Sequence, residues 1–182
     1  MNDRQKLLLL LKEKSYEKKR VILSSGKESN FYIDVKQTAL HPEGMYLIGK
    51  LLFEKLIKEG SPVQAVGGLT LGADPLSVSV SLISYLEKKP ISSFFIRKEP
   101  KTHGTREWLE GTKNLSLGMS VAILEDVVTT GGSTLKSIER TTLSGYQVKR
   151  VIAIVDREEG GEEAIRKAGY VLESLFRKSD FC

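Results

Sequence analysis

Cysteine is almost absent from this sequence of 182 residues, because its one cysteine, Cys182, is the last residue. A single thiol forms no internal disulfide and cannot supply the several ligands of a thiolate metal cluster. Histidine is nearly as scarce, and His41 has no companion at the spacing of a metal site. We therefore expect a protein of a reducing compartment, the cytoplasm.

Long apolar runs are missing as well. The leucine run Leu7–Leu11 is far shorter than the roughly 20 residues that a membrane-spanning helix needs. Lysines surround this run, so it predicts an amphipathic helix, and no signal-peptide cleavage pattern follows it. Internal repeats, low-complexity tracts and shifts in composition are also absent. We expect no membrane or targeting segment, and one domain covering residues 1–182.

Acidic residues are in the minority, since 28 Lys and Arg residues against 23 Asp and Glu residues leave a formal net charge of +5. Such an excess suits nucleic acid, an acidic membrane or a strongly anionic small substrate. Charge by itself leaves these three open, so the choice depends on motifs.

The sequence does contain a regular alternation of short apolar runs and helical patterns. The runs that predict strands are residues 63–66, 91–96, 121–124 and 151–155. A helix is predicted from Pro42 to a stop at Gly60, with apolar residues at helical spacing at Ile48, Leu51, Leu52 and Leu56. This succession is typical of an α/β fold in which helices flank a mostly parallel central sheet.

The N-terminal part has a different pattern. Residues 21–23 are apolar, a polar turn follows, and then FYIDV alternates strictly. The alternation predicts a strand with Phe31, Ile33 and Val35 on one face. We expect this strand and residues 21–23 to form a hairpin.

One strand end carries an acidic pair. In α/β sheets ligands bind beyond the carboxyl ends of the strands, and in VAILEDVVTTGGST the apolar run ends at Leu124, before Glu125 and Asp126. Gly131 and Gly132 permit positive φ angles, so successive amides can converge on an anion at the start of the next helix. Acids beside such a phosphate cradle suit a ribose 5-phosphate, because carboxylates accept hydrogen bonds from ribose hydroxyls and stabilise positive charge on the ring.

A plain alternative is a turn that leads into a capped helix, with both acids solvated. The string lacks the lysine of a nucleoside-triphosphate P-loop, and the sequence has no G-x-G-x-x-G, G-x-S-x-G or H-E-x-x-H motif. VAILEDVVTTGGST resembles the phosphoribosyl pyrophosphate (PRPP) motif of the type I phosphoribosyltransferases. The resemblance implies that PRPP contacts Glu125, Asp126, Val127, Val128, Thr129, Thr130, Gly131, Gly132 and Ser133.

The stretch FFIRKEPKTHGTREWLEGTKN has no clear periodicity and is basic at its start. Long loops of this kind are often lids, although a solvated charged loop is the plain alternative. RKEPKTHG resembles the active-site loop of the orotate phosphoribosyltransferase family, and with it the resemblance spans nearly the whole chain. In that family the loop closes over pyrophosphate and is shared across a homodimer. The resemblance implies that Arg97, Lys101 and His103 act across the interface, while Lys98 serves its own site.

Arg157 follows the strand predicted at 151–155. A guanidinium binds a carboxylate through two parallel hydrogen bonds, and orotate carries a carboxylate. An exposed pair with Glu158, Glu159 or Glu162 is an equally simple explanation. The family resemblance assigns Arg157 and Thr129 to the orotate pocket.

The resemblance also implies a division into a hood of residues 1–40 and an α/β core of residues 41–182. Tyr32 and Ile33 of the hood would border the orotate ring.

Two positions depart from the family. Many members place a lysine that contacts PRPP in the segment LSSGKESN and another in GGLTLGADP, where this sequence has Ser24 and Leu71. The departures concern how the diphosphate of PRPP is neutralised.

The implied function is Mg²⁺-dependent transfer of ribose 5-phosphate from PRPP to orotate, giving orotidine 5′-monophosphate and pyrophosphate in pyrimidine biosynthesis. Positive charge would grow on the ribose beside Glu125 and Asp126. Negative charge would grow on the leaving group beneath Arg97, Lys98, Lys101 and His103. The expected catalytic residues are Asp126, Lys101 and His103, and the last two are alternative proton donors to pyrophosphate. We expect Mg²⁺ to be held mainly through PRPP rather than by protein ligands.

Two rival functions share part of this pattern. A purine phosphoribosyltransferase would keep the PRPP motif but would not need Arg157. A regulator that binds PRPP and nucleic acid would explain the positive charge, but not a complete lid, and the sequence has no helix-turn-helix, RRM or basic amphipathic stripe. We expect no nucleic-acid partner and no membrane partner.

Overall fold

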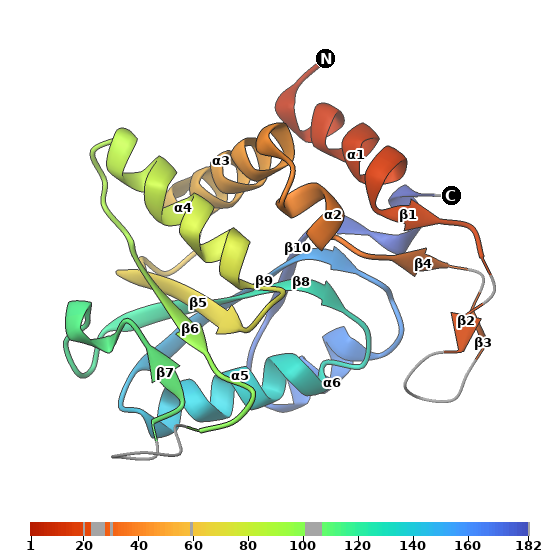
Figure 1. Ribbon diagram of the computed structural model, residues 1–182. Coiled ribbons are helices and arrows are strands. Elements are labelled where there is room, and N and C mark those ends of the chain that lie inside the picture. Colours follow the sequence, from red (N-terminus) through yellow and green to blue (C-terminus); the bar gives the residue numbers. More distant parts are fainter. Residues whose placement is uncertain (20, 23–27, 30, 59, 101–106, 182) are drawn as a thin grey trace.

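The computed structural model describes residues 1–19, 21–22, 28–29, 31–58, 60–100 and 107–181. Within these ranges its centre is a six-stranded sheet in the order β10-β9-β8-β5-β6-β7 (Figure 1). The neighbouring strands run parallel except for the antiparallel edge strand β7. The strands are β5 (Ala65–Leu69), β6 (Ser92–Ile96), β7 (Leu109–Glu110), β8 (Ser120–Val128), β9 (Gln147–Asp156) and β10 (Leu172–Arg177). The expected α/β fold is confirmed, while β10 had not been predicted.

Helices cover both faces of the sheet (Figure 1). On one side lie α3 (Pro42–Lys58) and α4 (Asp74–Leu86), with α1 (Asp3–Lys14) and the short α2 (Lys36–Ala39) beside them. On the other lie α5 (Gly132–Leu143) and α6 (Gly161–Lys167). Short 3-10 turns span Thr112–Asn114 and Lys178–Asp180. Among the described helices, none combines the length and the apolar character needed to cross a membrane.

Strand alternation divides the apolar side chains between two cores, because successive residues of a strand point to opposite faces. Leu124 packs in one buried cluster with Leu52 of α3. Its neighbour Ile123 packs in the other with Ile138 of α5 and Ile165 of α6. Both faces of the parallel strands are therefore buried, which is why these strands appear in the sequence as continuous apolar runs.

The helix predicted from Pro42 is confirmed as α3. Ile48, Leu52 and Leu56, at helical spacing, are buried. The helix ends at Lys58, and Gly60 then adopts a positive φ of 73°, a conformation that glycine reaches without a Cβ clash.

The expected hairpin between residues 21–23 and 31–35 is wrong. Instead, β2 (Val21–Ile22) pairs with β3 (Glu28–Ser29), and β4 (Tyr32–Ile33) pairs with β1 (Tyr16–Glu17). The Phe31 ring lies 5.1 Å from that of Tyr16 and 5.6 Å from that of Phe181. Burial of this aromatic cluster favours the pairing with β1. The predicted alternation is confirmed, since Phe31, Ile33 and Val35 are all buried.

The N-terminal segment shares a core with the rest of the chain. Leu7 and Leu11 of α1 belong to the same buried cluster as Leu52 of α3 and Ile154 of β9. This shared core supports our proposal that residues 1–182 form one domain, with residues 1–40 as a subregion.

The strand order changes direction between β5 and β8. These strands are neighbours, but α4 leads from β5 to β6 on one side, while α5 leads from β8 to β9 on the other. Ligands of open α/β sheets bind in the crevice beyond the strand ends at such a point. In this protein the residues that follow β5 and the end of β8 lie at this crevice.

Candidate active site

A cleft of about 250 Å³ opens at this point of the sheet. It is lined by Lys36, Leu69, Thr70, Leu71, Gly72, Lys98, Glu125 and Asp126. The lining comes from α2, the β5–α4 loop, the residues after β6 and the strand β8. Of the predicted site residues, the fold thus brings Lys98 to the acidic pair.

The acidic pair lies within β8 rather than after it. The strand continues to Val128, so the expected end at Leu124 is wrong. Val127 and Val128 remain in register with Val155 and Asp156 of β9, and this pairing carries the strand past the acids. Val128 is buried and Val127 packs against the α3-side core. Glu125 and Asp126 are therefore held by the sheet itself, which is a more rigid position than a loop.

Glu125 is bound to the start of α5. Its Oε2 accepts hydrogen bonds from Ser133 Oγ at 3.0 Å and Thr134 Oγ1 at 2.9 Å, and the residue is 5% exposed. Asp126 Oδ1 accepts from the backbone N–H of Val127 at 2.9 Å. The acid pair and the predicted phosphate loop thus form one connected unit.

Both carboxyl groups are destabilised as anions. The pKa of Glu125 is raised to about 7, first because burial disfavours the charged form and second because the charge of Asp126 lies beside it. Burial also raises the pKa of Asp126, against the opposing influence of the Lys36 ammonium. The pair therefore gains stability from hydroxyl donors or from positive charge that enters the cleft.

The loop after β8 presents open amides. Gly131 has a φ of +83°, as its predicted freedom allows, whereas Gly132 is the first residue of α5. Thr130, Gly132 and Ser133 are exposed. Within the described ranges no side chain caps the N-terminus of α5. Uncapped amides and the helix dipole favour an anion at this position.

The β5–α4 loop lies very close to the acids. A Cβ atom on Gly72 would lie 2.6 Å from Asp126 Oδ1, and one on Gly68 would overlap the carbonyl oxygen of Leu124. Glycine lets β5 approach β8 at Gly68, and lets the β5–α4 loop approach Asp126 at Gly72. Leu71, in the same loop, is 68% exposed and brings no charge to the cleft.

Arg157 lies beside the predicted base pocket. Its backbone N–H donates to the carbonyl oxygen of Val128 at 2.9 Å, next to Thr129. Its Nη2 donates to the carbonyl oxygen of Phe31 at 3.0 Å and to Glu159 Oε1 at 3.1 Å. Arg157 therefore links the end of β8, next to Thr129, to the backbone just before Tyr32 and Ile33. Glu159 is one of the surface partners considered from the sequence, but the arginine is buried.

The basic loop is held at both ends. Arg97 Nη1 lies 2.7 Å from Glu110 Oε1, and its backbone N–H donates to the carbonyl oxygen of Trp108 at 2.8 Å. Arg140 of α5 donates to the carbonyl oxygen of Arg97 at 2.8 Å, and its guanidinium lies 3.8 Å from the centre of the Trp108 ring. Lys101 and His103 lie outside the described residues, and so does Ser24.

Lys36 is a cleft residue that sequence reasoning missed. Its Nζ lies 2.6 Å from Asp34 Oδ1 and 3.7 Å from Asp126 Oδ2. The sequence signals the pair with Asp34, two residues away, but no local pattern links position 36 to position 126.

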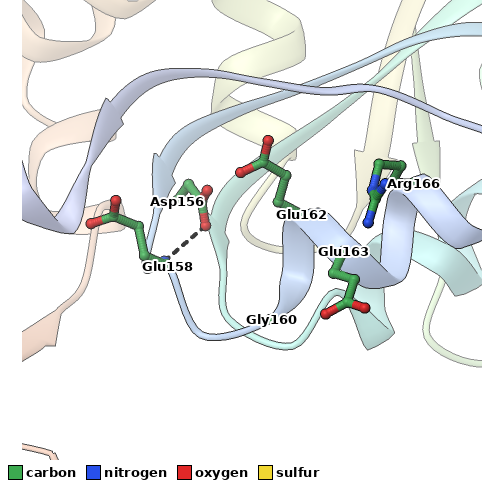
Figure 2. A pocket seen from close by; sticks show the side chains of 6 residues that line it. All are labelled: Asp156, Glu158, Gly160, Glu162, Glu163 and Arg166. Atoms are coloured by element: carbon green, nitrogen blue, oxygen red, sulfur yellow. Dashed lines mark hydrogen bonds between the residues drawn. The ribbon is translucent and has the colours of Figure 1, made fainter.

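A larger hollow of about 420 Å³ lies where β9 passes into α6 (Figure 2). It is lined by Asp156, Glu158, Gly160, Glu162, Glu163 and Arg166. In Figure 2 the carboxylates of Glu158, Glu162 and Glu163 point in different directions. Across the described residues, no group of three or more His, Cys, Asp or Glu side chains is placed to hold a metal ion. The smaller cleft brings the acid pair and Lys98 together, so it is the candidate active site.

Comparison with known proteins finds relatives over the whole chain, although no family model matches it. Over 181 residues the chain is 50% identical to the orotate phosphoribosyltransferase of Sorangium cellulosum (strain So ce56), covering 99% of the chain and 93% of that protein. It also resembles the crystal structure of Mycobacterium tuberculosis H37Rv orotate phosphoribosyltransferase in complex with Fe(III) dicitrate, with a TM-score of 0.85 and 35% identity over 99% of each chain. For the complex of that enzyme with PRPP, the TM-score is 0.80 and the identity 32%, again over 99% of each chain.

Proposed function

Because this chain belongs to the orotate phosphoribosyltransferase family, we propose that its cleft transfers the phosphoribosyl group of PRPP to orotate, releasing pyrophosphate. The product is orotidine 5′-monophosphate, and the reaction belongs to pyrimidine synthesis. The observation that carries the proposal is the acid pair, Glu125 and Asp126, in which Glu125 is hydrogen-bonded to the uncapped start of α5. The scarcity of cysteine supports the cytoplasm as its compartment.

Two parts of PRPP, the 5-phosphate and the ribose, fit this arrangement. The 5-phosphate accepts hydrogen bonds from amides of Thr129–Ser133 at the start of α5. The ribose hydroxyls donate to Asp126 and Glu125, because burial raises the pKa of both carboxyl groups and new donors stabilise their anions. As the bond to pyrophosphate breaks, the same carboxylates stabilise positive charge on the ribose ring.

Orotate fits the neighbouring pocket. Arg157 is held by Phe31 and Glu159 beside Thr129, and its guanidinium is the group that we assign to the orotate carboxylate. Tyr32 and Ile33 border the ring in this proposal. A purine substrate has no such carboxylate, so the buried arginine favours orotate over a purine.

Mg²⁺ suits the donor set of the cleft. Carboxylate oxygens of Asp126 and Glu125 are hard ligands that bind Mg²⁺ directly or through water. When bound, the ion neutralises diphosphate oxygens of PRPP. We propose that it binds chiefly through the substrate, with the acid pair as an outer contact.

A homodimer is supported by an apolar stripe on α4. Val78, Leu82 and Leu86 are exposed and spaced four residues apart, so they share one helix face. Leu71, in the loop that leads into α4, is also exposed and lines the cleft. We propose that the stripe pairs with the same stripe of a second copy, which brings the partner's basic loop toward the cleft.

The Leu82→Glu variant is expected to weaken the dimer at least about tenfold, because a twofold interface would bury two unpaired carboxylates. Sedimentation at several concentrations measures the dimer dissociation constant. Leu143→Glu, at another exposed leucine on α5, is the matched control. An unchanged dimer constant for Leu82→Glu would exclude α4 as the interface.

The Lys101→Ala variant is expected to lower kcat roughly 100-fold with little change in PRPP affinity, because its charge acts on the leaving group as the bond breaks. Steady-state kinetics and calorimetry measure the two quantities.

Co-expression of the Lys101→Ala variant with an Asp126→Asn variant tests whether the loop is shared between subunits. If each loop serves the partner's cleft, mixed dimers restore about a quarter of wild-type activity. No recovery would place the loop in its own cleft.

The assay that tests the proposed function mixes the protein with Mg²⁺, PRPP and orotate. Loss of orotate absorbance and release of pyrophosphate are followed together, with adenine and hypoxanthine as competing acceptors. Turnover with orotate supports the proposal. Turnover with a purine but not with orotate would show that the protein is a purine phosphoribosyltransferase. Salt-sensitive binding of nucleic acid without any turnover would support the regulator hypothesis.

A further inference from the structure

Lys36 reaches the acid pair from the N-terminal segment. It is the first residue of α2, yet its side chain lines the cleft together with Lys98 and the β5–α4 loop. Its Nζ lies 2.6 Å from Asp34 Oδ1 and 3.7 Å from Asp126 Oδ2. The fold therefore holds an ammonium group beside the carboxylate that, in the proposed function, binds the ribose.

The ammonium is positively charged and keeps capacity for a ligand. Burial opposes its charge, but the hydrogen bond to Asp34 and the charge of Asp126 raise the pKa of Lys36 above its ordinary value. The side chain is 41% exposed, so a ligand in the cleft can reach it. An ammonium has three donor hydrogens, and Lys36 can therefore keep Asp34 while it donates to another acceptor.

The geometry of PRPP indicates that acceptor. The diphosphate is attached to C1 of the ribose, and the nearest hydroxyl is on the adjacent carbon, C2. A cation within 3.7 Å of the carboxylate that accepts from such hydroxyls is close to the first phosphate of the diphosphate. The facing loop, at Leu71, offers that phosphate no side-chain charge.

Resting on the proposed function, we propose that Lys36 is a substrate-binding residue that contacts the diphosphate of PRPP and the pyrophosphate formed from it. Asp34 is then a positioning residue, because its carboxylate directs the ammonium into the cleft. Lys36 of α2 thus supplies the diphosphate with a positive charge that the residue at position 71, a leucine, does not supply.

Binding of two separate ligands tests this role. Calorimetry with Mg²⁺-pyrophosphate and with ribose 5-phosphate divides PRPP into its halves. Lys36→Ala is expected to weaken pyrophosphate binding roughly 10- to 100-fold, the range for a charge-assisted hydrogen bond. Ribose 5-phosphate binding should change little, and Lys36→Arg should retain most of the pyrophosphate affinity.

Lys50→Ala is the matched control, because Lys50 also forms a 2.6 Å ion pair, with Asp3, away from the cleft. Unchanged pyrophosphate binding in Lys36→Ala would overturn the proposal. Equal losses for both ligands would also overturn it, since they would mean that Lys36 acts through Asp126 or the fold. Turnover of orotate by the wild type separates the two hypotheses. If the wild type does not turn over orotate, the proposed function fails. If it does, unchanged pyrophosphate binding in Lys36→Ala refutes only the role of Lys36.

Discussion

The Asp126→Asn variant is expected to lose roughly 100- to 1000-fold in kcat, while its affinity for PRPP changes little. Asparagine keeps an oxygen that accepts from the Val127 amide and from a ribose hydroxyl, but it removes the negative charge. That charge matters most when positive charge develops on the ribose, so its loss raises the barrier more than it weakens binding. Steady-state kinetics give kcat, and calorimetry gives PRPP affinity.

Asp3→Asn is the control for this variant. Asp3 also pairs with a lysine, Lys50, but lies on α1 away from the cleft. Its replacement should leave kcat at the wild-type value. If Asp126→Asn loses PRPP affinity and kcat by the same factor, Asp126 serves in ground-state binding and the charge argument is wrong.

The Glu125→Gln variant is expected to be less active but more stable than the wild type above pH 7. The pKa of Glu125 is raised by folding from 4.5 to about 7, so ionisation costs stability as pH rises through that window. Below pH 4.5 the carboxyl is neutral in both states and this cost is absent. Glutamine stays neutral at every pH, which gives a gain on the order of 3 kcal/mol at pH 8 in the unliganded protein.

Denaturant unfolding at pH 4.5, 6 and 8 measures this difference. The two proteins should converge at low pH and separate as pH rises, and kcat of the variant should fall roughly 100-fold. Glu163→Gln is the control, because Glu163 is an exposed residue whose pKa is lowered by Lys167. A Glu125→Gln variant that is equally stable at pH 8 would show that Glu125 bears no burial cost in solution.

Such a cost is characteristic of a functional position. Glu125 lies in the middle of a sheet whose other buried members are mostly apolar, and Ser133 and Thr134 satisfy it only in part. An isolated carboxylate there weakens the fold. The site thus holds a group that the fold alone does not favour, and a ligand with hydroxyl donors offsets the cost.

Local signals in the sequence predicted the features that depend on a few neighbouring residues. The spacing of Ile48, Leu52 and Leu56 predicted α3, and the alternation at Phe31, Ile33 and Val35 predicted a buried face. Gly131 predicted the positive φ at the start of α5. Each depends on backbone geometry or on the period of one element, so the information lies within a short window.

Contacts between distant segments were the features that sequence reasoning got wrong or missed. The pairing of β4 with β1 depends on Phe181, about 150 residues after Phe31, and the extension of β8 past Glu125 depends on β9. The position of Lys36 beside Asp126 depends on how α2 sits over the sheet. The segments that make these contacts are too far apart in the chain for a short stretch of sequence to contain both.

The sequence by itself determined the fold class, the acid pair with its amide loop, and the positions available to bind an anion, because periodicity, glycine and charge act locally. Only the tertiary structure decided which side chains share the cleft, that Glu125 is buried against α5, and that Arg157 meets the N-terminal segment. Those outcomes depend on the packing of segments far apart in the chain, where burial of apolar surface selects one arrangement among many that local preference permits.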